Sequence, residues 1–99
     1  STLRELYQRA KSLDEKAEKE RSNAKLLESI QGYKELIEIH GAILNDTIFI
    51  EIAKRCIERM RFIGKMKQAV DIHYKLIHRF MDDPSYQNQL AVTYLLANR

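Results

Sequence analysis

Apolar side chains recur every three or four residues from Ile48 to Met81, with one interruption at Gly64. This spacing matches the period of an α-helix and predicts one buried stripe on each side of the glycine. A glycine ends a helix readily because it adopts the left-handed conformation without a Cβ clash. The segment therefore predicts a helical hairpin with a tight turn. Its expected buried faces are Phe49, Ala53, Cys56, Ile57, Met60 and Ile63 before the turn and Met66, Ala69, Val70, His73, Leu76, Ile77 and Phe80 after it.

The same periodicity predicts three further helices. Ser22 has a short polar side chain that can cap a helix, and Pro84 suits a first helical position, which needs no amide hydrogen bond. The five expected helices are 2–21, 23–40, 46–63, 65–81 and 83–98. Their remaining apolar faces are Leu3, Leu6, Ala10, Leu13 and Ala17 in the first, Leu26, Leu27, Ile30, Tyr33, Leu36 and Ile37 in the second, and Tyr86, Leu90, Ala91, Tyr94 and Leu95 in the fifth.

An internal repeat relates two of these helices. Residues 29–36 align with residues 69–76, with small, large and apolar positions in register, and Ala91 with Leu90 and Tyr94 fits the start of a further unit. The spacing is irregular, and Met81 stands where a closing proline is usual in a tetratricopeptide unit. We therefore expect an all-α, tetratricopeptide-like helical repeat (an α-α superhelix) of about five antiparallel helices, forming one domain over residues 1–99.

Composition narrows the function classes. The net charge of +3 comes from basic residues interleaved with acidic ones, whereas a nucleic-acid groove needs cations segregated on one face. No apolar run approaches the roughly 20 residues that span a bilayer. The single cysteine, Cys56, lies on an apolar stripe and is expected to be buried and inert. The chain begins without methionine and stops within a helical pattern, which suggests a piece of a longer protein.

The sequence offers no catalytic constellation. His73 and His78 are five residues apart and point in different directions on a helix, and no His-x-Asp element of an iron oxygenase is present. His73 falls on a core-facing position, where a hydrogen-bonded buried histidine is expected. Glycine-rich phosphate loops and nucleophile elbows are also missing from the sequence. We therefore expect no catalytic, cofactor-binding or metal-binding residue and no enzymatic activity in the chain itself.

Two surface features are candidates for binding or modification. First helices line the concave face of tetratricopeptide stacks, which predicts a partner-binding face of Glu51, Lys54, Glu58 and Arg61 with Ser85, Asn88 and Val92. Plain solvation remains an alternative for each of these residues. Some tetratricopeptide proteins bind the C-terminal carboxylate of a partner with a lysine and an asparagine one helical turn later. Here Lys54 is present, but Glu58 stands in the place of the asparagine and would repel a carboxylate. Separately, Asn45-Asp46-Thr47 has the form of an N-glycosylation acceptor, although Asn45, Asp46 and Thr47 are each also plausible caps for the helix that follows.

The fifth helix has an apolar face of its own. If it opens a repeat whose second helix lies outside this chain, some of its large side chains have no partner. Contiguous apolar patches tend to find another surface. We therefore expect either weak self-association through this helix or fraying of its last turns; the residues concerned are Leu90, Tyr94, Leu95 and Leu96.

Three stretches carry a family resemblance: 17–23 (AEKERSN), 59–66 (RMRFIGKM) and 88–96 (NQLAVTYLL). They resemble the tetratricopeptide region of the aspartyl/asparaginyl β-hydroxylases, and the similarity extends from about residue 13 to residue 99. The resemblance implies a parent that is a single-pass membrane protein with this region in the endoplasmic reticulum lumen. It also implies a separate oxygenase domain that uses Fe(II) and 2-oxoglutarate to hydroxylate aspartate or asparagine in epidermal-growth-factor-like (EGF-like) domains.

By this resemblance the helical region helps to dock EGF-like substrates beside the oxygenase domain, while the iron and 2-oxoglutarate residues lie in that other domain. A second interpretation stays open: a tetratricopeptide adaptor module that binds a peptide or protein partner. The sequence beyond Arg99 would separate the two, since further repeats followed by a His-x-Asp element favour the hydroxylase.

Overall fold

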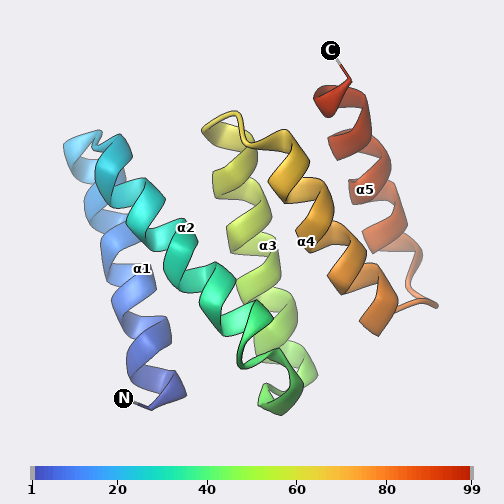
Figure 1. The fold of residues 1–99 in the computed structure, drawn as a ribbon, viewed down its shortest axis with the longest axis horizontal. Helices are drawn as coiled ribbons and strands as arrows, with labels where there is room; N and C mark the ends of the chain where they lie inside the picture. The colour runs from blue at the N-terminus through green and yellow to red at the C-terminus, as the bar shows by residue number, and fades with distance from the viewer. Residues whose placement is uncertain (1, 99) are drawn as a thin grey trace. The chain divides into compact units, whose positions relative to one another are not determined.

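The structure, a computed structural model, describes residues 2–98, and within the last helix it describes every side chain except those of Ser85 and Gln89. These residues form five α-helices and one short 3₁₀ helix, with no strand among them (Figure 1). Each α-helix begins and ends within two residues of its expected range, so the prediction of an all-α fold of five helices is confirmed. The elements are α1 (Leu3–Glu20), α2 (Asn23–Glu38), η1 (Gly41–Ile43), α3 (Asp46–Phe62), α4 (Met66–Arg79) and α5 (Pro84–Ala97).

The helix ends follow from local side-chain chemistry. Ser22 Oγ accepts a hydrogen bond from the Lys25 amide at 3.2 Å and so caps α2. Asn45 Oδ1 accepts from the Ile48 amide at 2.9 Å and caps α3 in the same way. Gly64 has φ +84, the left-handed conformation expected for the turn between α3 and α4. The predicted caps at Ser22 and Asn45 and the glycine turn are therefore confirmed.

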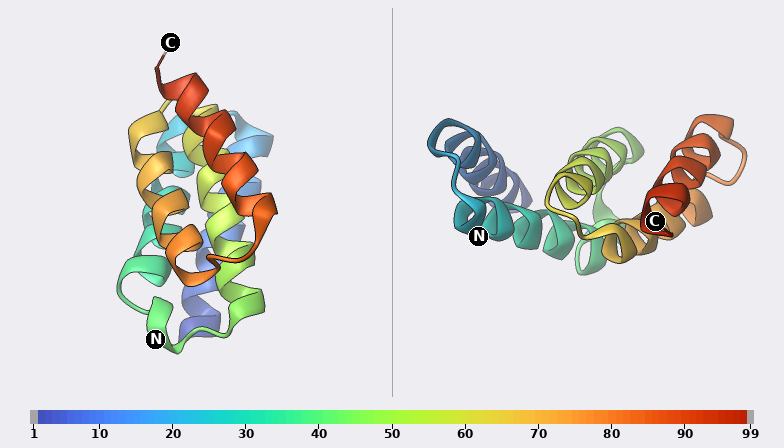
Figure 2. Two further views of the ribbon diagram at one scale, coloured as in Figure 1. Left: turned by 90° about the vertical axis from the view of Figure 1, so that its right-hand side faces the viewer. Right: turned by 90° about the horizontal axis from the view of Figure 1, so that it is seen from above.

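The chain divides within α3 into two compact units, one ending at Arg55 and the other beginning at Cys56. Unit 1 contains α1, α2, η1 and the first part of α3. Unit 2 contains the last part of α3 with α4 and α5. In each unit two antiparallel helices pack side by side, α1 with α2 and α4 with α5 (Figures 1 and 2).

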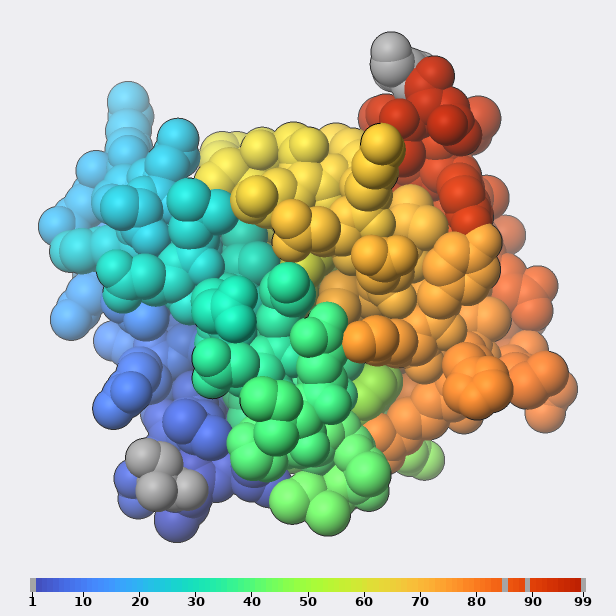
Figure 3. Space-filling model, viewed as in Figure 1, coloured from blue at the N-terminus to red at the C-terminus, as the bar shows by residue number. Residues whose placement is uncertain are grey.

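In unit 1, the closest approach of α1 and α2 is made by small residues. A Cβ placed on Gly32 would lie only 3.1 Å from the Cβ of Ala10, which is tighter than an ordinary van der Waals contact, so the helices approach closely here. One turn away, Ser29 Oγ donates a hydrogen bond to the Ala10 carbonyl oxygen at 2.9 Å. The side chains of α2 cover one face of α1 in the space-filling view (Figure 3). This close contact fixes the position of α1, which carries part of the site described below.

In unit 2, aromatic pairs accompany the packing of α4 and its C-terminal turn on α5. The rings of Tyr74 and Tyr94 meet edge-to-face with centroids 5.9 Å apart. Phe80, which follows α4, lies 5.6 Å from the ring of Tyr86 near the start of α5. The two pairs lie eight residues apart on α5, so they hold the helix against α4 along about two turns.

The burial pattern agrees with the internal repeat. The small residues Ser29 and Ala69 are both fully buried, and so are Leu36 and Leu76. Tyr33 of α2 and His73 of α4 occupy the same position of the repeat, and both are buried residues with a polar group. Corresponding residues of α2 and α4 therefore face the cores of their units at the same helical positions.

Several expected core positions are wrong. Leu27 is 42% exposed, because it lies at the edge of the stripe that Leu26 and Ile30 define. In α5, Tyr86 and Thr93 are buried, and they share one face because they are seven residues apart. Ala91 and Leu95 are two residues from Thr93, about 200° around the helix, and both are exposed. The periodicity also misses Ile52 and Ile72, both buried.

Buried and outward positions should respond differently to substitution. Ala69 has no exposed surface, so Ala69→Leu is expected to overpack its surroundings and lower the free energy of unfolding by ~1–3 kcal/mol. Lys34 is half-exposed on α2, and Lys34→Ala should change it by no more than about 0.5 kcal/mol. Urea denaturation of the two variants measures both values. Equal losses would mean that these helix faces are assigned wrongly.

Candidate functional site

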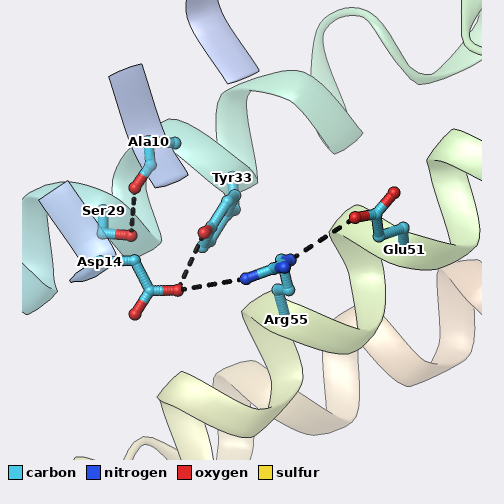
Figure 4. A network of polar contacts seen from close by, with 6 residues as sticks. All are labelled: Ala10, Asp14, Ser29, Tyr33, Glu51 and Arg55. Atoms are coloured by element: carbon cyan, nitrogen blue, oxygen red, sulfur yellow. Dashed lines mark hydrogen bonds and ion pairs between the residues drawn. The ribbon is translucent and has the colours of Figure 1, made fainter. Parts of the chain in front are cut away.

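A polar network of unit 1 is centred on a buried carboxylate. Asp14 on α1 is 3% exposed, and its Oδ2 accepts a hydrogen bond from the Tyr33 hydroxyl of α2 at 2.9 Å (Figure 4). The same oxygen lies 3.9 Å from Arg55 Nη1 on α3. On its other side, Arg55 Nε lies 3.8 Å from Glu51 Oε1, one helical turn earlier. The network thus links all three α-helices that contribute to unit 1.

A second tyrosine lies beside this network. The Tyr7 ring packs against the Tyr33 ring with centroids 6.4 Å apart, and Lys11 Nζ lies 5.1 Å from the Tyr7 ring centroid. The Tyr7 hydroxyl is buried and has no hydrogen-bond partner within bonding distance among the described residues. Burial, and secondarily the nearby Glu51 carboxylate, raise the pKa of Tyr7 to about 12.

The electrostatics of the network favour positioning over proton transfer. Burial and the Asp14 carboxylate also raise the pKa of Tyr33 well above its ordinary value. Both phenols therefore keep their protons at neutral pH and are poor general bases. What the arrangement does is hold the half-exposed Arg55 between two carboxylates, which orients Arg55 and Glu51 on α3.

A buried polar pair joins α4 to α5 in unit 2. His73 on α4 has no exposed surface, and its Nε2 lies 2.8 Å from Thr93 Oγ1 on α5, so the two share a hydrogen bond. Its Nδ1 is buried and has no hydrogen-bond partner among the described residues. Burial, with a smaller contribution from the positive charge of Arg61, lowers the pKa of His73 to about 4. The predicted hydrogen-bonded core histidine is confirmed, and it is neutral at physiological pH.

The predicted partner-binding residues are divided between the two units. In unit 1, Glu51 and Lys54 are both half-exposed, and Glu51 is the partner of Arg55. In unit 2, Glu58 and Asn88 are exposed and Arg61 is half-exposed. Val92 is 45% exposed, and the side chain of Ser85 lies outside the described residues. Helical spacing places Glu51, Lys54, Glu58 and Arg61 along one side of α3. Binding of a partner to this side of the helix stays a prediction.

Four other expectations concern glycosylation, the single cysteine, metal binding and membrane crossing. Asn45 is exposed, so its cap role leaves the glycosylation acceptor untested. Cys56 is buried, as expected. Among the residues that the structure describes, no group of three or more His, Cys, Asp or Glu side chains is placed to hold a metal ion. Within the same residues, no helix combines the length and apolar character that crossing a bilayer requires.

Sequence reasoning missed the central network of unit 1. Asp14 looks like one more charge on a mixed α1, and Arg55 looks like a solvated residue of α3. One signal was available: Asp14 lies four residues after Ala10 and three before Ala17, so helical spacing places it on the apolar stripe. A charged residue on such a stripe predicts a buried partner elsewhere in the chain.

Comparison with known proteins gives one consistent result. The chain is 33% identical over 90 residues to aspartyl/asparaginyl beta-hydroxylase of mouse (Mus musculus), a match that includes 91% of the chain. It is 32% identical over 90 residues to the human (Homo sapiens) protein of the same name. The chain spans only 12% of the length of each of these relatives. No model of a known protein family matches the chain. The resemblance to a region of these hydroxylases is therefore confirmed.

Proposed function

Because the chain is similar to one segment of the aspartyl/asparaginyl β-hydroxylases, we propose that it is a non-catalytic helical-repeat region of such an enzyme. In this proposal it helps to dock EGF-like domains, while a separate domain of the parent hydroxylates aspartate or asparagine. The similarity over 91% of the chain is the observation that carries the proposal. The helical hairpins support it, because stacked hairpins are a common scaffold for protein recognition.

A docking role assigns the chemistry to the parent's oxygenase domain. Fe(II) and 2-oxoglutarate are the cofactors proposed for that domain, and the parent is proposed to be a single-pass membrane protein of the endoplasmic reticulum. The described residues of this chain contain no cluster that fits iron, so no reaction step is assigned to them. The partners of the chain are then the oxygenase domain and the EGF-like substrate.

The proposed docking surface uses exposed side chains of α3 and α5. Glu58 and Asn88 are the best candidates, because both side chains are exposed. Glu51 is a weaker candidate, since its carboxylate already lies beside Arg55. Polar residues of this kind suit the hydrogen-bonded rim of a protein interface, which is well hydrated.

Site-specific cross-linking in the full-length parent tests the proposal. A photoreactive amino acid at Asn88 is expected to cross-link to an EGF-like domain, and the same group at Gln31, exposed on α2, is expected to give little product. Comparable yields at the two positions, or none at either, would contradict docking on this face. Specific capture of a linear peptide in place of the folded domain would favour the adaptor interpretation.

A further inference from the structure

The turn between α3 and α4 carries an exposed aromatic side chain. Phe62, the last residue of α3, is 78% exposed. Ile63 and Met66 are half-exposed on either side of the turn. A Cβ placed on Gly64 would meet no atom within 4 Å, so the turn faces open space. It lies at one end of the hairpin, in yellow in Figures 1 and 3.

Basic residues surround this aromatic. Residues 59–67, named here the basic turn, contain Arg59, Arg61, Lys65 and Lys67 and no acidic residue. Lys67 is exposed, while Arg61 and Lys65 are half-exposed. The nearest acids along the chain are Glu58 and Asp71, which lie outside the turn. The positive charge of the chain is concentrated in unit 2, because residues 1–55 contain ten basic and ten acidic residues.

The hairpin of α1 and α2 provides an internal comparison. Its turn, residues 18–25, alternates acidic and basic side chains and has no aromatic residue. There, Lys25 is paired with Glu20. The turn of the α1–α2 hairpin therefore lacks the combination of a large apolar side chain with unbroken positive charge that the basic turn has.

We propose that the basic turn binds the surface of an anionic lipid bilayer. Phe62 would enter the headgroup region, while Arg61, Lys65 and Lys67 would lie on lipid phosphates and carboxylates. Apolar side chains flanked by cations bind such surfaces because they combine burial with attraction to anionic lipid. A projecting turn fits a deformable surface directly, whereas a protein partner would need a preformed pocket for Phe62. This inference does not depend on the proposed docking function.

Tryptophan fluorescence tests the insertion of Phe62 directly, since the chain has no tryptophan. The emission of Phe62→Trp should shift to the blue with phosphatidylcholine vesicles that contain about 30% phosphatidylserine, and not with pure phosphatidylcholine. About 0.5 M salt should reverse the shift, because it screens the surface charge. Ile39→Trp, at a 70% exposed position in unit 1, is the control and should show no shift.

Vesicle sedimentation with matched charge reversals tests the role of the cations. Each cation at an anionic surface strengthens binding about fivefold, so Lys65→Glu with Lys67→Glu should weaken it more than about tenfold. Lys16→Glu with Lys19→Glu, both exposed on α1, gives the same net charge and should weaken it less than about threefold. Circular dichroism checks that both variants are folded.

Equal losses for the two charge reversals would show that only net charge matters and would overturn the proposal. So would an unshifted Phe62→Trp spectrum. Binding to polyglutamate with no binding to anionic vesicles would identify an acidic protein surface as the partner and would also overturn it.

Discussion

Acidification from about pH 7 to about pH 4 should lower the free energy of unfolding by about 3 kcal/mol through His73 alone. The pKa of this histidine falls from 6.5 to about 4 in the folded chain, because the side chain is buried and Arg61 adds positive charge nearby. In the protonated ring both nitrogens carry an N–H group, and the one on Nδ1 has no acceptor among the described residues. It would also add a charge to a fully buried position.

The direction follows from proton binding. Between about pH 6.5 and about pH 4 the unfolded chain binds a proton at His73 that the folded chain does not, so stability falls as the pH falls. Above about pH 6.5 both states are neutral there, and the contribution of His73 is complete. Because the hydrogen bond to Thr93 joins α4 to α5, the loss should appear first in the packing of α5.

Urea denaturation across this pH range, for the natural chain and His73→Gln, isolates the effect. Glutamine can still hydrogen-bond Thr93 but does not titrate, so the stability of the variant should depend less on pH by about 3 kcal/mol. Carboxylates contribute to both curves and cancel in the difference. Parallel curves would mean that His73 is accessible to protons in the folded chain.

Replacing Asp14, the buried carboxylate of unit 1, should lower the free energy of unfolding by a similar amount. Asp14→Ala leaves the Tyr33 hydroxyl without its acceptor and Arg55 without a buried counter-charge, which should lower the free energy of unfolding by about 2–4 kcal/mol. Asp14→Asn keeps an acceptor for Tyr33 and should cost less, about 1 kcal/mol.

The neighbouring residue supplies the control for Asp14. Glu15 is exposed on the same helix, and Glu15→Ala should change stability by no more than about 0.5 kcal/mol. Thermal and urea denaturation of the three variants give the comparison. If Asp14→Ala and Glu15→Ala are equally mild, the network in Figure 4 does not contribute to the stability of unit 1.

Helices were predictable here because local chemistry determines their ends. Ser22, Asn45 and Gly64 act through atoms only a few residues away, so their roles can be inferred from neighbouring residues. The buried face of a helix was harder to assign where the apolar periodicity is weak. In α5, Leu95 is apolar but exposed, whereas Thr93 is polar but buried because His73 offers it a partner from α4.

The site was less predictable than the fold, since its contacts join distant positions. The Tyr33–Asp14 hydrogen bond connects residues nineteen apart, and Arg55 reaches Asp14 from a third helix. Helical spacing gives the face of each residue but not the partner that it meets. Glu51, Lys54, Glu58, Arg61 and Asn88, which are predicted to bind a partner, are polar and exposed or half-exposed. This agrees with docking and with solvation alike, so only a functional measurement separates the two.

That measurement is the steady-state kinetics of the full-length parent on an EGF-like domain. Glu58→Ala with Asn88→Ala should raise KM about tenfold and leave kcat unchanged, because docking residues contribute binding that is uniform through the reaction. Glu35→Ala with Gln31→Ala also removes one carboxylate and one carboxamide, from exposed positions of α2, and should change neither constant. An unchanged KM in the first variant, or a fall in kcat with KM constant, would contradict a docking role for this helical region.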